Sequence, residues 1–131
     1  MYTPYLCILI SYYLIYMPRW TLVAGAMLKS EGGYDNVQPR VQHEGLKGAP
    51  LRALWAHQNA FESFAPFVAS VLMAKLAAVP DADISQWSMI FVGARVLYTV
   101  SYIANWHPIR SLGFVVGMAA ITALMVLAMQ A

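Results

Sequence analysis

Apolar residues are gathered into four segments, each close to the length of about 20 residues that a helix needs to cross a bilayer. They run over residues 3–28, 56–79, 84–106 and 111–129. The one long polar stretch, residues 29–55, is rich in Gly, Pro and charge and predicts a loop. Pro80 and Pro108 lie in the two short connections, where a proline ends the preceding helix. We therefore predict an all-α, antiparallel up-down four-helix bundle in a membrane, forming a single domain over residues 1–131.

Composition supports the bilayer as the solvent. The chain is 60% hydrophobic and 11% charged, whereas a soluble domain carries about 25% charged residues. A chain of this length could not hide so much apolar surface from water. The net charge is only +2 and the basic residues are scattered, so nothing indicates nucleic-acid binding. The single cysteine and the wide spacing of the three histidines also argue against a disulfide and against a metal site.

The distribution of basic residues orients the predicted bundle. The first segment lacks the basic start and small-residue cleavage site of a signal peptide, so we expect it to be a retained span. Most basic residues lie in or beside the first and third connections between the predicted helices. Lys75 is the one basic residue near the opposite end of the bundle. The positive-inside rule therefore predicts that loop 29–55 faces the cytoplasm and that both termini face away from it.

Three ionisable residues lie deep inside the predicted spans: Arg19, Glu62 and Arg95. At 1.5 Å per residue, each lies about 12–16 Å from the cytoplasmic end of its own helix. Such residues usually face the bundle interior or a wet cavity. If the two cations and the one anion lie at one level of the membrane, the anion can pair with one cation, and the other cation keeps an unpaired positive charge. Two interpretations stay open: a structural ion pair that locks the helices together, and a binding site for an anionic small molecule.

Neighbouring polar residues favour the binding site. Asn59 and Glu62 are spaced i, i+3 on one helix face. Arg95, Tyr98 and Tyr102 are spaced i, i+3, i+7 on another. A transporter or channel fits poorly, because polar residues confined to the cytoplasmic half give no continuous path.

These motifs resemble a known family. The run Arg52-x6-Asn59-x2-Glu62-x3-Pro66-Phe67, then Arg95-x2-Tyr98-x3-Tyr102, then Pro108-Ile109-Arg110-Ser111 is similar to the MAPEG family, the membrane-associated proteins in eicosanoid and glutathione metabolism. The similarity covers residues 52–117 and is nearest to the bacterial branch, which implies a multi-pass protein of the bacterial inner membrane. It also implies a homotrimer that binds glutathione between adjacent subunits.

The resemblance implies a role for each matching residue. Asn59 and Glu62 would hold the amino and carboxylate end of glutathione, lined by Arg95, Tyr98 and Tyr102. Arg52 and Arg19 complete the expected glutathione-binding set. Arg110, with Ser111 next to it, would lie beside the sulfur as the catalytic pair.

The implied activity is that of a glutathione S-transferase or peroxidase, with glutathione as co-substrate. A guanidinium beside the sulfur favours the nucleophilic thiolate, which would attack a lipophilic electrophile dissolved in the bilayer. The alternative is a non-catalytic membrane bundle that keeps the polar core for assembly or ligand binding. Trp55 stands where the eukaryotic transferases usually carry an additional arginine. The sequence does not identify the second substrate.

Overall fold

The computed structural model describes residues 2–131, and the regular structure in that range is entirely helical. The elements, in chain order, are α1 (Thr3–Pro18), the π-helical segment η1 (Arg19–Val23), α2 (Ala24–Lys29), α3 (Pro39–His43), α4 (Gly48–Leu76), α5 (Asp81–Ile103) and α6 (His107–Gln130). The predicted all-α class is confirmed. The stretch 29–55, expected as a loop, contains α3 and the first turns of α4.

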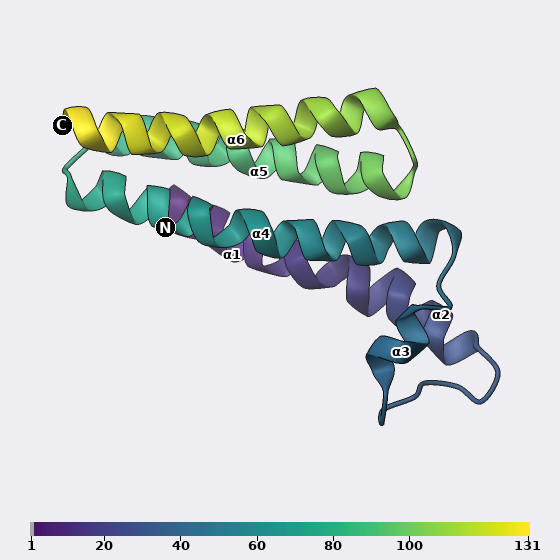
Figure 1. The fold of residues 1–131 in the computed structure, drawn as a ribbon. Helices are drawn as coiled ribbons and strands as arrows, with labels where there is room; N and C mark the ends of the chain where they lie inside the picture. The colour runs from purple at the N-terminus through teal and green to yellow at the C-terminus, as the bar shows by residue number, and fades with distance from the viewer. Residues whose placement is uncertain (1) are drawn as a thin grey trace.

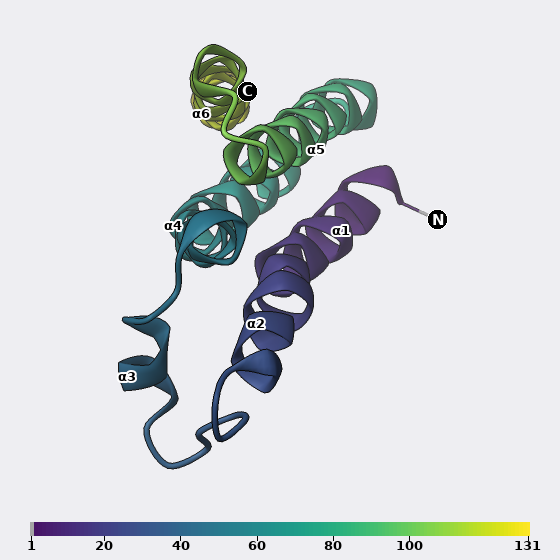
Figure 2. The ribbon, with the colours of Figure 1, turned by 90° about the vertical axis from the view of Figure 1, so that its right-hand side faces the viewer.

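The long helices run antiparallel, as predicted (Figure 1). α1, η1 and α2 form one continuous rod, and α4, α5 and α6 follow it in alternating directions, so that both termini lie at one end. The α2–α4 connection, with α3, lies at the other end of the bundle, as does the α5–α6 turn. Viewed along the rods, α4 and α5 lie in the middle, with α1 and α6 on opposite sides (Figure 2). The α4–α5 interface is therefore the natural place for a central polar site.

The two short turns share one geometry. Two residues after the end of α4 and of α5, the chain has a residue in the left-handed region: Ala78 at φ 59° and Asn105 at φ 64°. The next N–H, of Val79 and of Trp106 respectively, bonds back to the carbonyl five residues earlier, at 3.0 and 2.8 Å. This is the Schellman arrangement, in which the last carbonyls of a helix are satisfied before the chain turns. The two turns set the register of α4, α5 and α6.

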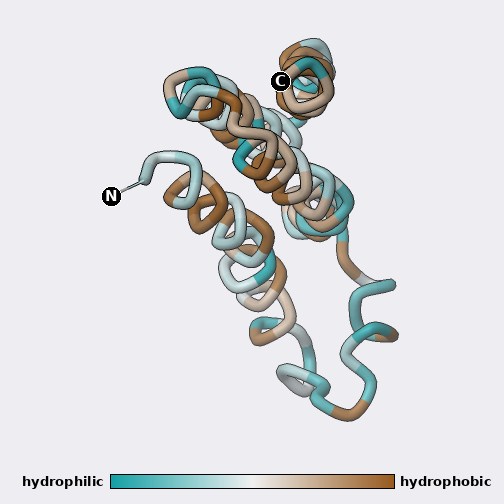
Figure 3. The backbone as a smooth tube through the Cα atoms, turned by 90° about the vertical axis from the view of Figure 1, so that its left-hand side faces the viewer, coloured by the Kyte–Doolittle hydropathy of each residue, from teal (hydrophilic) through white to brown (hydrophobic). Residues whose placement is uncertain are grey.

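The surface of the rods is strongly apolar, whereas hydrophilic residues concentrate in the α2–α4 connection (Figure 3). By length and composition, two helices among the described residues could cross a membrane: Thr3–Lys29 and His107–Gln130. Four spans were expected. α4 and α5 are long enough but not apolar enough to be counted with them, because each carries polar residues in its middle, such as Glu62 and Arg95.

α6 packs closely against α5 through a glycine. A Cβ on Gly113 would come within 3.0 Å of the Ala94 carbonyl oxygen and 3.1 Å of the Tyr98 backbone nitrogen. One turn later the contact relaxes, because a Cβ on Gly117 would meet the Arg95 Cδ at an ordinary 3.6 Å. Small residues allow such close approach between membrane helices. Gly113 therefore sets the distance of α6 from the part of α5 that carries Arg95 and Tyr98.

Candidate functional site

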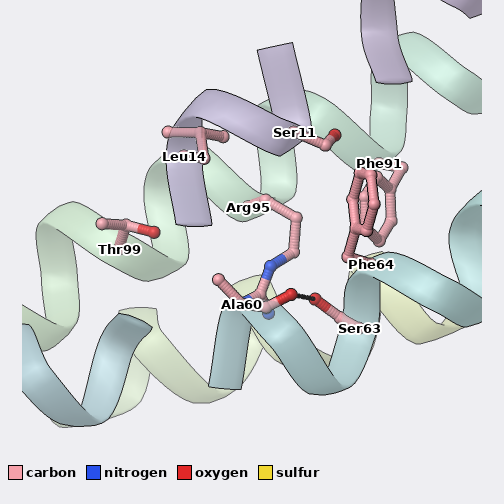
Figure 4. Close-up of a pocket in the computed structure, with 8 residues that line it drawn as sticks. All are labelled: Ser11, Leu14, Ala60, Ser63, Phe64, Phe91, Arg95 and Thr99. Atoms are coloured by element: carbon pink, nitrogen blue, oxygen red, sulfur yellow. Dashed lines mark hydrogen bonds between the residues drawn. The ribbon is translucent and has the colours of Figure 1, made fainter. Parts of the chain in front are cut away.

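Arg95 occupies the centre of the bundle. Arg95 is 4% exposed, and its side chain extends from α5 toward α4 (Figure 4). The Arg95 Nη2 donates a 2.8 Å hydrogen bond to the Asn59 Oδ1. A buried guanidinium is costly unless its donors are satisfied. Asn59 is thus the group that makes the position of Arg95 tolerable, and it ties α5 to α4.

Asn59 also connects Arg95 to Glu62. Because the Asn59 carbonyl oxygen accepts from Arg95, its Nδ2 points the other way and donates to the Glu62 Oε2 at 3.3 Å. Glu62 itself is exposed. Within residues 2–131 no ion pair joins Glu62 to an arginine; the amide lies between them. In place of the expected direct ion pair, two hydrogen bonds through Asn59 connect Arg95 to Glu62, and the Glu62 carboxylate stays accessible at the surface.

Two tyrosines continue the polar face of α5, and a cation lies over each ring. The Arg95 Cζ is 4.2 Å from the centre of the Tyr98 ring, and the Arg110 Cζ is 4.6 Å from that of Tyr102. The tyrosine rings contact each other edge to face at 5.5 Å. Cation–π contacts of this kind hold a guanidinium in place without neutralising its charge. Arg110, at the start of α6, is therefore brought to the same face as Tyr98 and Tyr102.

An open groove of about 350 Å³ runs along this face. Its lining residues come from α4 and α5: Trp55, Gln58, Asn59, Glu62, Tyr98 and Tyr102. Ligand sites commonly have about 300–1,000 Å³, so the groove has room for a small molecule at the lower end of that range. Trp55 and Gln58 were not predicted as site residues. Their spacing from Asn59 and Glu62, i, i+3, i+4, i+7, is the sequence signal that could have found them.

On the other side of Arg95, toward α1, there is space for little more than one water molecule. This second cavity measures about 10 Å³ and is lined partly by Ser11, Ser63 and Thr99 (Figure 4). The Ser63 hydroxyl donates to the Ala60 carbonyl at 3.2 Å, within α4. A ligand as large as a tripeptide therefore has access to the cluster only from the open groove.

Five predicted residues are not part of the groove lining. Arg95 and Arg110 are adjacent to it, through their contacts with Asn59, Tyr98 and Tyr102, and the other three lie elsewhere. The Arg52 Nε donates a 2.9 Å hydrogen bond to the Ile103 carbonyl at the end of α5. Ser111 is exposed on α6 and is not part of the groove lining. Arg19, expected at one level with Glu62 and Arg95, instead contacts His43 of α3, with 3.0 Å between Nη1 and Nε2. The residue count predicted a depth along the helix but not the direction in which the Arg19 side chain points.

His57 was not identified as a notable residue from the sequence. It is buried on the α1 side of α4, and its Nδ1 bonds to the Ile15 carbonyl. The Arg19 backbone N–H bonds to the Tyr16 carbonyl, where the helix changes to the π-helical segment η1 after Pro18. A ring nitrogen that faces a carbonyl must donate, so the neutral ring carries its proton on Nδ1. His57 therefore joins α4 to α1 at the point where the α1 helix is interrupted.

Comparison with known proteins gives one match. The sequence model of the MAPEG family matches residues 3–130. Neither the curated proteins nor the solved structures include one that matches the chain. The matched region includes the groove, Arg110 and the segment η1, which begins at Arg19.

Proposed function

This chain belongs to the MAPEG family of helical membrane proteins of glutathione and eicosanoid metabolism, and from that membership we propose that it is a glutathione S-transferase or peroxidase acting on lipophilic electrophiles. The observation that carries the proposal is the groove between α4 and α5. Its lining includes the Glu62 carboxylate and the Asn59 amide, and Arg110 lies over the ring of Tyr102, another lining residue.

The chemistry of glutathione fits these groups. Its ammonium would pair with the exposed Glu62 carboxylate, and its γ-glutamyl carboxylate would lie near the charge of Arg95 and the Asn59 amide. The sulfur would then extend toward Arg110. A guanidinium beside a thiol lowers the thiol pKa and increases the thiolate fraction at neutral pH. In the transferase reaction the thiolate sulfur forms a bond to an electrophilic carbon, and the leaving group departs with the electrons of its own bond.

The membrane setting explains how both substrates reach the groove. The groove is open and is bordered by Trp55, which is 44% exposed, so an apolar electrophile can approach from the lipid. We propose that a neighbouring subunit of a homotrimer covers the groove and shields the thiolate from water. The proposal includes a multi-pass chain in a bacterial inner membrane, with the α2–α4 connection in the cytoplasm and the termini on the opposite side.

A non-catalytic bundle is the second candidate. It is favoured by the fact that both arginines next to the groove already have an intramolecular contact, Arg95 with Asn59 and Arg110 with the Tyr102 ring. A protein of this kind would keep these contacts for assembly and would not bind glutathione.

Replacing Asn59 with alanine is the test of glutathione binding. We expect calorimetry on detergent-purified protein to show roughly 100-fold weaker glutathione binding, because charge-assisted contacts are lost and the charge of Arg95 is left unpaired. Gln86→Ala, at an exposed position near the start of α5 and far from the groove, is the matched control and should bind as the wild type does. Circular dichroism verifies that both variants are helical. Absence of glutathione binding to the wild type would support the non-catalytic bundle.

A further inference from the structure

A larger cavity, of about 520 Å³, lies where η1, α3 and α4 meet. α3 belongs to the connection between α2 and α4 (Figure 2). It is lined by Arg19, Pro39, Arg40, His43, Leu54, His57 and Gln58. Gln58 is the one lining residue that it shares with the groove. The other six residues that line the cavity have no part in the proposed glutathione chemistry. That chemistry therefore does not account for the cavity.

The lining carries positive charge without a balancing acid. Arg19 and Arg40 contribute guanidinium groups, and no Asp or Glu lines the cavity. The only ion pair within residues 2–131, Lys75 with Asp81, lies at the opposite end of the bundle. Clustered guanidinium groups repel one another, and an anion bound between them would relieve that repulsion.

Both histidines in the cavity already have a hydrogen-bond partner. The His43 Nε2 accepts from the Arg19 Nη1. Burial, and next the charge of Arg19, hold the pKa of His43 below its ordinary value. The His57 Nδ1 is committed to the Ile15 carbonyl. The cavity therefore offers two guanidinium groups and a His43 ring whose protonation is disfavoured.

We propose that this cavity binds a phosphate group, held by Arg19 and Arg40, either as an anionic phospholipid headgroup or as a free phosphate ion. Guanidinium groups match phosphate oxygens in bidentate geometry. The cavity borders the apolar surface of the α1–η1 rod, where Trp20 is 58% exposed, and aromatic residues of this kind mark the membrane interface. Basic pockets between helices at that level bind anionic headgroups.

Arg40→Gln tests the proposal, with Lys29→Gln as the matched control. Both residues are exposed and lie at the same end of the molecule, both changes remove one positive charge, and only Arg40 lines the cavity. Calorimetry in detergent would use short-chain phosphatidylglycerol, phosphatidylcholine of the same chain length, and inorganic phosphate. We expect phosphatidylglycerol or inorganic phosphate to bind the wild type, and to bind Arg40→Gln about tenfold more weakly, the loss expected for one charge-assisted contact.

Each outcome decides the proposal. Binding of phosphatidylglycerol alone identifies the headgroup as the source, and binding of inorganic phosphate identifies the free ion; both support a phosphate site. Equal weakening in Arg40→Gln and Lys29→Gln, equal binding of the two lipids, or no binding at all overturns it. Displacement of the phosphate ligand by glutathione would also overturn it, because the cavity would then be an extension of the groove. Arg19→Lys keeps the positive charge but loses the paired N–H donors of the guanidinium. We expect this variant to bind the phosphate ligand with intermediate affinity.

Discussion

Arg110→Ala is expected to lower kcat/KM for conjugation of glutathione with a lipophilic electrophile by about 100-fold. Removing one positioned group that stabilises a developing or bound anion costs a factor of roughly 10²–10³ in catalysis. The Arg110 Cζ lies 4.6 Å from the centre of the Tyr102 ring, and Tyr102 lines the groove. Conjugation would be followed by absorbance in detergent, with glutathione affinity determined separately so that loss of chemistry is distinguished from loss of binding.

Two further variants make the result specific to the guanidinium. Arg110→Lys keeps a positive charge but loses the planar guanidinium with its paired N–H donors, and we expect partial conjugation activity. Lys47→Ala removes an exposed charge just before α4 and should leave the rate unchanged. If Arg110→Ala conjugates glutathione as fast as the wild type, Arg110 is a structural residue and the thiolate is stabilised elsewhere or not at all.

Gly113→Val is expected to destabilise the protein by about 1–3 kcal/mol, the usual cost of overpacking a tight contact. The atoms nearest to the new side chain are backbone atoms of Ala94 and Tyr98, which cannot rotate away. α6 must move, and Arg110 would move with it. Thermal unfolding in detergent, followed by circular dichroism, measures the effect.

Gly117→Ala is the control for this prediction. Its new Cβ would meet only side chains, at 3.6 Å or more, and a helical Gly→Ala change gains roughly 0.5–1 kcal/mol of helix stability. We expect the midpoint of unfolding to be unchanged or raised. A loss equal to that of Gly113→Val would mean that the two glycines are under the same constraint, contrary to the geometry.

Helical periodicity was sufficient to predict much of this molecule. It grouped Asn59 with Glu62, and Arg95 with Tyr98 and Tyr102, and in the structure these residues meet across the α4–α5 interface. Periodicity describes one helix at a time. It could not show that the Asn59 amide would lie between the two charges.

Arg19 shows what the sequence could not indicate. Counting residues gives a depth along a helix, but the direction of the side chain depends on the rotation of that helix, and the π-helical segment η1 changes the rotation at Arg19 itself. The partner, His43, comes from a short helix within a stretch whose composition indicated only a loop. Long-range contacts of this kind depend on the path of the connection and leave no local pattern.

The account rests on a glutathione thiol that ionises in the groove, so the pH titration of thiolate absorbance on the wild-type protein at saturating glutathione tests it most directly. We predict half-ionisation at least about one pH unit below the ordinary thiol value of about 8.5, because Arg110 favours the anion. Titration of the bound thiol at its ordinary value would contradict thiolate stabilisation and with it the proposed catalysis.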